Sequence, residues 1–384
     1  MGSAVFLVLA AMCVSVAHAQ PVRIGDINSY KAFPEHLEPY RKGWRLAQEE
    51  LNAAGGVSGR RIEIVSRDDA MRADDAVRHA AELVAEEKVG LLMGGFTSGV
   101  SLALAAFANR QRIVYLATTA LTGELAGANA SRYTFSLRPS GAMQAAMLLP
   151  EAMKLDKKRW AIVYPHNMYD GAAVARFRTR LMKEQPSVDV VYEQIVPLGQ
   201  IDAWGIVRWL EDNQVQAVLS LLFGADLREF VTRGREKNLF ARVQVLNLLA
   251  GQPEDLAFLA GSVAEGWWVT GYPASDVDYG SHQRFVTQYR KRWGESPAAA
   301  SLYGYTALIA IAHALRRSQS TDPERLVKAF EELRVATPVG PLQWRKDRHS
   351  TMGAFVGQLA ASENGPAMVR WRYESGARYL PPEP

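Results

Sequence analysis

The stretch 51–69, LNAAGGVSGRRIEIVSRDD, places the end of a helix directly before a strand. Gly55 and Gly56 suit a helix C-terminus, because glycine adopts the left-handed conformation that ends a helix at little cost. After the turn at Ser58-Gly59, Ile62 and Ile64 alternate with polar residues, which predicts a strand that ends at residue 66. The glycines therefore stop a helix so that a strand can pack beside an earlier one.

The same alternation of helix and strand continues along the chain. The helix before the glycines has a buried face at spacings of four, three and four, formed by Tyr40, Trp44, Ala47 and Leu51. Strands are expected at 22–25, 90–95, 112–120, 158–165, 188–195, 215–223, 242–249 and 267–273. Further helices are expected at 74–89, 97–111, 170–184, 203–213, 225–238, 281–294 and 303–318. The segment 337–360 reads as a strand, a turn and another strand.

Strands that alternate with helices imply βαβ units and parallel sheets. A second set of such units begins after Arg138-Pro139. The 384 residues are also too many for one ordinary core, so two domains are expected. The predicted fold class is therefore α/β, with two doubly wound lobes.

Composition excludes several classes of protein. Apolar residues make up 48% of the chain and charged residues 22%, as in soluble globular proteins. The net charge of +4 is small for this length, and no block of Lys and Arg could follow a phosphate backbone. We therefore expect no nucleic-acid partner.

The first 19 residues have the pattern of a signal peptide. Residues 4–16 are apolar and too few to span a bilayer, and Ala17-His18-Ala19 supplies the small residues that precede a cleavage site. No Lys or Arg precedes the apolar run, which leaves a different start codon open. Met12 is too bulky for Cys13 to be a lipid-modification site. We expect export to the periplasm and cleavage after Ala19, which would leave a mature chain without cysteine, and so without a disulfide or a Cys-ligated metal.

In doubly wound sheets, ligands bind outside the carboxyl ends of the strands. The loop GGFTSG, residues 94–99, is the most distinctive of the loops that follow strands. Its glycines would let the backbone approach a ligand, and the hydroxyls of Thr97 and Ser98 at a helix N-terminus would suit an anion. The alternative is that Thr97 or Ser98 only caps the helix.

Signals for catalysis are missing from the sequence. The motifs GxxxxGK[ST], GxGxxG and GxSxG do not occur, and the seven histidines show no metal-binding spacing. Asp68 and Asp69 could form a catalytic pair, but adjacent residues of a strand face opposite sides, so capping or an ion pair is the better interpretation. We expect no catalytic residue, no metal and no cofactor.

Several segments together carry a family resemblance. They are VRIGDINSY, ELNAAGGVSGRRIEIVSRDDA, GGFTSGVSLA, AEGWWVTGYP and TPVGPLQW. Over nearly the whole mature chain, the sequence resembles the leucine/isoleucine/valine-type substrate-binding proteins of ABC transporters. The resemblance implies two α/β lobes joined by three hinge crossings, with a small ligand closed between them. It also implies a monomer that delivers its ligand to an ABC permease in the inner membrane. The expected lobes are 20–137 plus 271–340, and 138–270 plus 341–384.

The resemblance also implies ligand contacts. Ser98 matches the hydroxyl that holds the ligand carboxylate, and the Thr119 backbone matches a contact to an α-amino group. Tyr169 and Phe223 match aromatic residues of the second lobe, and Tyr30 lies in a loop that often reaches the ligand. With the neighbouring strand-end residues, the candidate ligand-binding set is Tyr30, Phe96, Thr97, Ser98, Thr118, Thr119, Tyr169, Phe223 and Leu249.

Two positions depart from the amino-acid binders of that family. Leu121 stands where they have a threonine, and Leu249 stands where they have an acid that neutralises the α-ammonium. Because a buried ammonium without a carboxylate is costly, we expect a ligand that lacks it: a carboxylate, an aromatic acid or an amide. A shift of the alignment by a few residues would bring Glu254 or Asp226 into that place instead.

Two other functions remain open at this point. The same fold could serve as a ligand-sensing subunit of a membrane receptor, and neighbouring genes for a permease and an ATPase would favour transport. An enzyme would need a convergent acid, base or nucleophile, which the strand-end loops do not offer.

Overall fold

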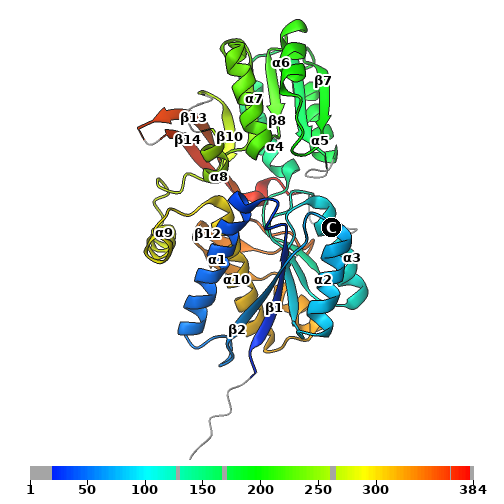
Figure 1. The fold of residues 1–384 in the computed structure, drawn as a ribbon, viewed down its shortest axis with the longest axis vertical. Helices are drawn as coiled ribbons and strands as arrows, with labels where there is room; N and C mark the ends of the chain where they lie inside the picture. Colours follow the sequence, from blue (N-terminus) through cyan, green and yellow to red (C-terminus); the bar gives the residue numbers. More distant parts are fainter. Residues whose placement is uncertain (1–19, 127–129, 167–170, 260–264, 364, 381–384) are drawn as a thin grey trace, which may run out of the picture.

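The computed structural model describes residues 20–126, 130–166, 171–259, 265–363 and 365–380, and it contains two α/β lobes stacked end to end (Figure 1). The expected signal peptide, residues 1–19, lies outside the described residues. The first lobe is built on a parallel sheet in the order β2-β1-β3-β4-β5. Its strands are β1 (Val22–Asn28), β2 (Ile62–Asp68), β3 (Leu91–Gly94), β4 (Tyr115–Ala117) and β5 (Thr134–Ser136). Its first helices are α1 (Pro34–Ala53), α2 (Ala73–Ala85) and α3 (Ser98–Gln111).

The second lobe has a mixed sheet in the order β14-β13-β10-β9-β8-β6-β7. Strands β10, β9, β8, β6 and β7 are parallel, whereas β13 and β14 run antiparallel at one edge. The strands are β6 (Arg159–Pro165), β7 (Asp189–Val196), β8 (Ala217–Ser220), β9 (Gln244–Gly251), β10 (Trp268–Gly271), β13 (Ala354–Ser362) and β14 (Gly365–Glu374). The helices are α4 (Gly141–Lys154), α5 (Gly171–Glu184), α6 (Ala203–Asp212), α7 (Gly224–Glu236) and α8 (Pro253–Phe258), with a short 3₁₀ helix η1 (Leu239–Ala241).

The chain then returns to the first lobe before it ends in the second. The returning elements are α9 (Gly280–Trp293), α10 (Ala299–Ser318), α11 (Pro323–Phe330), β11 (Arg334–Thr337) and β12 (Gly340–Gln343). Helix α10 lies along α1 (Figure 1) at very close range: a Cβ on Gly43 would lie 2.0 Å from the Ser301 carbonyl oxygen, and one on Gly304 would lie 2.2 Å from that of Tyr40. The C-terminal third is therefore shared between the lobes, and the 3₁₀ helix η2 (Gly376–Arg378) follows the last strand.

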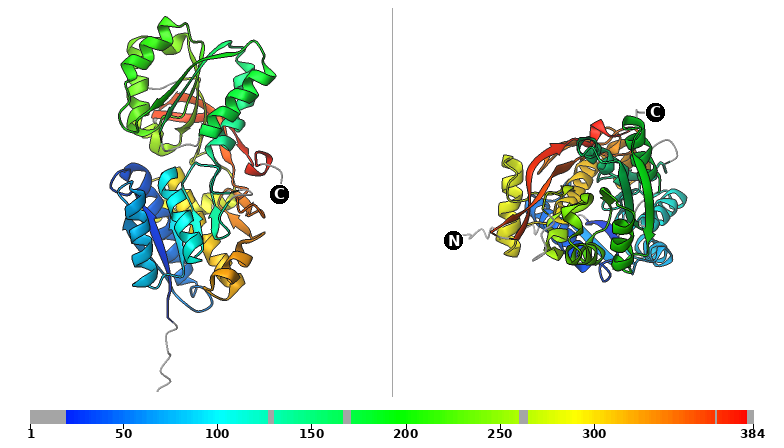
Figure 2. Two further views of the ribbon diagram at one scale, coloured as in Figure 1. Left: turned by 90° about the vertical axis from the view of Figure 1, so that its right-hand side faces the viewer. Right: turned by 90° about the horizontal axis from the view of Figure 1, so that it is seen from above.

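Three connections join the lobes, between β5 and α4, between β10 and α9, and between β12 and β13 (Figure 2). The boundary expected at residue 340 falls at the start of β12, which pairs with β11. We therefore propose lobe boundaries that follow the sheets, with the third crossing after residue 343. Among the described residues, no helix is both long enough and apolar enough to cross a membrane.

The quoted stretch folds as expected at its glycines. Helix α1 ends at Ala53, and Gly55 and Gly56 have φ angles of +92° and +77°. Strand β2 runs on to Asp68, two residues beyond the expected end, because it stays paired with β1 as far as Asn28. The two strands expected over 337–360 are present as β12 and β13, and they have different partners: β12 pairs with β11, whereas β13 pairs with β14 and β10.

Candidate functional site

The glycines of the GGFTSG loop serve packing within the first lobe. Gly94 and Gly95 have φ angles of +119° and +81°. A Cβ on Gly94 would lie 2.2 Å from the carbonyl oxygen of Ile27, and one on Gly95 would lie 2.1 Å from the hydroxyl of Tyr115. These contacts turn the chain at the end of β3, so that Phe96 and the start of α3 lie at the carboxyl edge of the sheet.

Thr97 is the N-cap residue of α3. Its hydroxyl oxygen accepts a hydrogen bond from the Val100 amide at 3.3 Å, so the capping interpretation holds for this residue. Ser98 is the first residue of the helix and is buried. The hydroxyl of Ser98 as a carboxylate ligand stays a prediction, and its place at a helix N-terminus is suited to that role.

Thr118 and Thr119 follow β4 and are tied to the same loop. The Thr118 hydroxyl lies 3.2 Å from the Tyr40 hydroxyl and 3.3 Å from the Gly94 carbonyl oxygen, and the Thr119 hydroxyl donates to the Gly95 carbonyl oxygen at 2.9 Å. Both side chains are buried. Their hydroxyls therefore hold the two strand-end loops together, and the Thr119 backbone is the part left for other contacts.

The Tyr30 side chain forms its contacts within the first lobe. Its hydroxyl donates to Asp26 at 2.6 Å, and the guanidinium of Arg41 lies 3.8 Å from its ring centroid. Ser66 also donates to Asp26, at 2.7 Å. Burial raises the pKa of Asp26 to about 6, although these hydrogen bonds oppose the rise. This network joins β1 to β2, and the structure does not bring Tyr30 to the aromatic residues described next.

Aromatic side chains from both lobes meet between them. Phe33, His36 and Phe96 come from the first lobe, and Phe223 and Phe258 come from the second; we call them the aromatic cluster. Ring centroids lie 4.7 Å apart for Phe33 and Phe96, 6.3 Å apart for Phe96 and Phe223, and 5.5 Å apart for His36 and Phe223. The structure therefore brings together Phe96 and Phe223, two of the residues expected at the site, from opposite lobes.

Two adjacent acidic residues of α8, Glu254 and Asp255, contact the first lobe. The Asp255 carboxylate accepts a hydrogen bond from the Gly224 amide at 2.8 Å and lies 3.4 Å from Nε2 of His36 on α1. The Glu254 carboxylate accepts hydrogen bonds from the amides of Ala299 and Ala300, at 3.0 Å each, at the N-terminus of α10. The two lobes are therefore joined by the carboxylates of Glu254 and Asp255 as well as by the aromatic cluster.

The surroundings of His36 and Glu254 raise the pKa of both side chains. Burial acts to lower the pKa of His36, but the negative charges of Asp255, Glu254 and Glu35 raise it overall. Burial raises the pKa of Glu254, and the charge of His36 opposes that rise. The sequence indicated Glu254 only as an alternative site residue. It did not indicate His36 or Asp255, because their contact exists only where the two lobes face each other.

Leu249 lies at the end of β9 and is buried. Its amide donates to the Asn247 side chain at 2.8 Å, which shapes the strand end. The acids that a shifted alignment would place here are already engaged: Glu254 binds α10, and the Asp226 carboxylate accepts from the Gly199 amide at 2.8 Å. Tyr169, the other aromatic residue expected in the second lobe, lies outside the described residues.

Arg138 was not expected at the site. It follows β5, is 5% exposed, and donates from Nη1 to the Thr119 carbonyl oxygen at 3.1 Å. Its guanidinium carbon lies 4.7 Å from the ring centroid of Tyr303 on α10. A cation therefore lies beside one of the expected ligand contacts, next to the first connection between the lobes.

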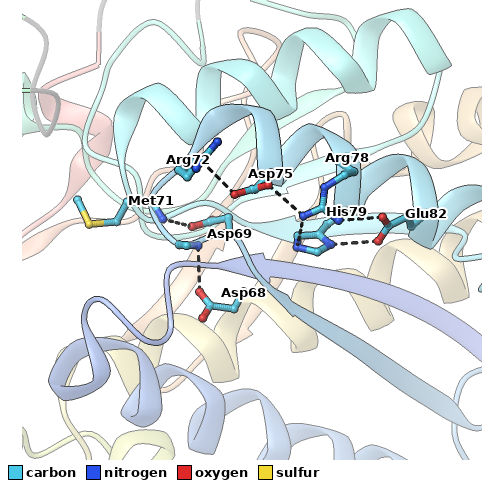
Figure 3. Close-up of polar contacts among 9 residues, drawn as sticks. Asp68, Asp69, Met71, Arg72, Asp75, Arg78, His79 and Glu82 are labelled. Atoms are coloured by element: carbon cyan, nitrogen blue, oxygen red, sulfur yellow. Dashed lines mark hydrogen bonds and ion pairs between the residues drawn. The ribbon is translucent and has the colours of Figure 1, made fainter.

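Asp68 and Asp69 form a turn and no catalytic pair (Figure 3). Asp68 accepts from the Ala70 amide at 3.1 Å, and Asp69 accepts from the Met71 amide at 2.9 Å. Asp69 also accepts from the Ser29 hydroxyl at 2.6 Å. Ala70 and Met71 have positive φ angles, which these hydrogen bonds stabilise. The turn leads into α2, whose exposed face carries the further ion pairs drawn in Figure 3.

A hollow of about 860 Å³ lies elsewhere, between α4 and α5 and beside the third connection. None of the expected site residues lines it, and its walls include Met143, Met153, Arg176 and Arg180. The strand-end residues above are the better candidates for a ligand site, because side chains of both lobes meet there. Within the described ranges, no group of three or more His, Cys, Asp or Glu side chains could hold a metal ion.

Comparisons with known proteins identify a family and a shared fold. Residues 25–365 match the model of the family described as periplasmic binding protein. A Leu/Ile/Val-binding protein homolog 7 of Brucella suis is 26% identical over 313 residues, which cover 77% of this chain and 76% of that protein.

Solved structures share the fold. A solute-binding protein of an ABC transporter from Rhodopseudomonas palustris, in complex with 3,4-dihydroxybenzoic acid, superimposes with a TM-score of 0.82 at 19% identity and covers 93% of this chain and 98% of its own. A branched-chain amino acid transporter substrate-binding protein from Streptococcus pneumoniae, in complex with isoleucine, gives a TM-score of 0.79 at 18% identity, with coverages of 92% and 99%.

Proposed function

The chain belongs to the periplasmic binding protein family, and on that premise we propose that it captures a small carboxylate between its two lobes for an ABC importer. Family membership implies an extracytoplasmic location. Export through the expected signal peptide, cleavage after Ala19, a monomeric state and delivery to an inner-membrane permease are parts of the same proposal. The mass of the exported protein would check the cleavage.

The observation that carries the proposal is the meeting of Phe96 and Phe223 across the lobes, at 6.3 Å between ring centroids. A solute that binds between two lobes stabilises the closed arrangement only if it contacts both of them. Strand-end residues of both sheets lie at this place, and rings from each lobe offer flat apolar surface to an aromatic or other apolar solute.

The choice of an acid over an amino acid rests on charge. Near Leu249, the Glu254 carboxylate accepts from the amides of Ala299 and Ala300. One oxygen of Asp255 accepts from the Gly224 amide and lies near His36, whereas its Oδ2 has no hydrogen-bond partner. A ligand ammonium at Leu249 itself would meet an apolar side chain in place of an acid, which is costly. The relatives named above bind 3,4-dihydroxybenzoic acid in one case and isoleucine in the other. We propose that this chain takes a carboxylate without a free α-amino group, and an aromatic acid is the first candidate.

A thermal-shift screen of the purified mature protein tests this function. The panel contains benzoate, 4-hydroxybenzoate, 3,4-dihydroxybenzoate, their amides, dicarboxylates, leucine, isoleucine and valine. A ligand at a hundred times its Kd stabilises the folded state by roughly 2.7 kcal/mol, which a melting curve resolves. We expect an acid without an α-amino group to raise Tm, and leucine to raise it weakly or not at all. Strong stabilisation by leucine, isoleucine or valine would overturn the inferred ligand class.

A further inference from the structure

Arg138 carries a buried charge that is only partly satisfied. Its Nη1 donates to the Thr119 carbonyl oxygen at 3.1 Å, whereas Nε and Nη2 are buried without a hydrogen-bond partner. In the part of the chain that the structure describes, no carboxylate forms an ion pair with it. Arg345, which is also mostly buried, does have such a partner, because it lies 2.9 Å from Asp347. Arg138 is thus a desolvated cation without an anion.

An unpaired buried cation is unfavourable unless something neutralises it. Removing a guanidinium from water is unfavourable, and a stacked ring and one carbonyl oxygen compensate for only part of the lost hydration. The ring of Tyr303 lies under the guanidinium, at 4.7 Å from its carbon. Burial raises the pKa of the Tyr303 hydroxyl, and Arg138 opposes that rise through its charge and a side-chain hydrogen bond to this hydroxyl. The phenol stays neutral and supplies no counter-charge.

The position of Arg138 connects it to the proposed ligand site. The Thr119 residue that accepts its Nη1 hydrogen bond also donates its hydroxyl to the Gly95 carbonyl oxygen, one residue before Phe96. The N-terminus of α3, which favours an anion, begins two residues after Phe96. The N-terminus of α10, by contrast, is already occupied by the carboxylate of Glu254. The guanidinium of Arg138 and the N-terminus of α3 are therefore both connected to the strand-end loops that contain Gly95 and Thr119.

We propose that Arg138 binds the carboxylate of the transported solute through Nε and Nη2 and so sets the preference for acids over neutral analogues. The proposal rests on the function proposed above. The two nitrogens form one edge of a planar guanidinium, and such an edge pairs with the two oxygens of a carboxylate. In this arrangement the solute supplies the anion that the chain does not.

Matched acids and amides test the assignment, because they differ in charge and hardly in shape. Isothermal titration compares benzoate with benzamide, and 4-hydroxybenzoate with 4-hydroxybenzamide. For the wild type we expect the acid to bind about tenfold to a hundredfold more tightly than its amide, because hydrogen bonds to a charged carboxylate contribute affinity of this size. In Arg138→Met, the acid should lose that advantage while the amide keeps its affinity, so the ratio should approach one.

Control variants separate this role from a structural one. Arg233 also lies over a ring, that of Trp204 at 5.2 Å, but it is on the surface of the second lobe, and Arg233→Met should leave both affinities unchanged. If Arg138→Met does not fold, Arg138→Lys keeps the charge without the planar edge and should show an intermediate ratio. Melting curves and circular dichroism verify the fold of each variant.

The outcomes distinguish this assignment from the function on which it rests. An acid-to-amide ratio in Arg138→Met or Arg138→Lys equal to that of the wild type would overturn the role of Arg138 while the solute-binding function stands. Equal affinity of the wild type for acid and amide would do the same without any variant. Binding of no solute by the wild type would contradict the proposed function, and the assignment of Arg138 with it.

Discussion

Nε2 of His36 on α1 lies 3.4 Å from a carboxylate oxygen of Asp255 on α8, and this contact joins the two lobes. Both side chains are buried, and the same carboxylate holds the amide of Gly224 at the start of α7. A buried ion pair between two bodies that separate favours the closed arrangement, because opening replaces it with water. Closure in this chain therefore rests partly on its own side chains, and the solute adds to it.

His36→Ala should shift the lobes toward the open arrangement and lower solute affinity. Removing one partner of a buried ion pair costs about 3 kcal/mol, because Asp255 is left without its cation. Small-angle scattering of the variant should give a larger radius of gyration than that of the wild type. His79→Ala is the control, since His79 pairs with Glu82 within α2, at 3.1 Å, and should leave the radius unchanged. An unchanged radius for both variants would remove His36 from closure.

The His36 contact should also make closure depend on pH. The pKa of His36 is raised from 6.5 when folded, so its stabilisation is fully present below that value and is lost as pH rises through the higher folded pKa. We expect solute affinity to decrease as the pH rises above 6.5, and His36→Ala to flatten that slope. Titrations across this range check the sign; an affinity that rises with pH equally in both proteins would contradict it.

Glu254→Gln should weaken the second contact between the lobes. Its carboxylate now accepts from two amides at the N-terminus of α10, and an amide side chain offers one acceptor oxygen and no charge. The loss should be up to about 2 kcal/mol, as for charges at helix N-termini. Asp322→Ala removes the N-cap hydrogen bond from the Arg325 amide at the start of α11, inside the first lobe, so it should lower Tm without changing solute affinity. Chemical unfolding and titration of both variants compare the two effects.

The sequence predicts more of the fold than of the candidate site. The spacing of Tyr40 and Trp44 and the glycines at 55 and 56 predicted α1 and its end, because helix periodicity and positive φ angles have local causes. Helix α4 was missed, since residues on nearly all its sides are buried and no polar face marks a period. Where the causes are local, the sequence pattern was sufficient.

Site residues depend on contacts that no local pattern encodes. Phe96 and Phe223 were predicted because both follow strands, and carboxyl ends of parallel strands share an edge. Tyr30 also follows a strand, yet its hydroxyl is used by Asp26, a detail of side-chain direction. His36 and Asp255 gave no signal, because their contact arises from the placement of one lobe against the other. Arg138 gave none because its partners, Thr119 and Tyr303, come from other segments of the chain.

Gly94→Ala should be strongly destabilising, whereas Gly99→Ala should not. Gly94 has a φ angle of +119°, and a Cβ would lie 2.2 Å from the Ile27 carbonyl oxygen, so the loss should exceed about 3 kcal/mol. A Cβ on Gly99, in the first turn of α3, would meet nothing within 4 Å and should stabilise the helix by about 0.5 kcal/mol. Denaturant unfolding of the two variants measures both; similar stabilities would contradict the packing assigned to Gly94.

We propose that a small acid is bound by both lobes at once, and a crystal structure of the mature protein with the acid that raises Tm most would show where that acid lies. We expect electron density for the acid between the lobes, in contact with Phe96 or Ser98 on one side and with Phe223 or Leu249 on the other, with the carboxylate on Arg138. An acid bound to one lobe alone, or in the hollow between α4 and α5, would contradict it.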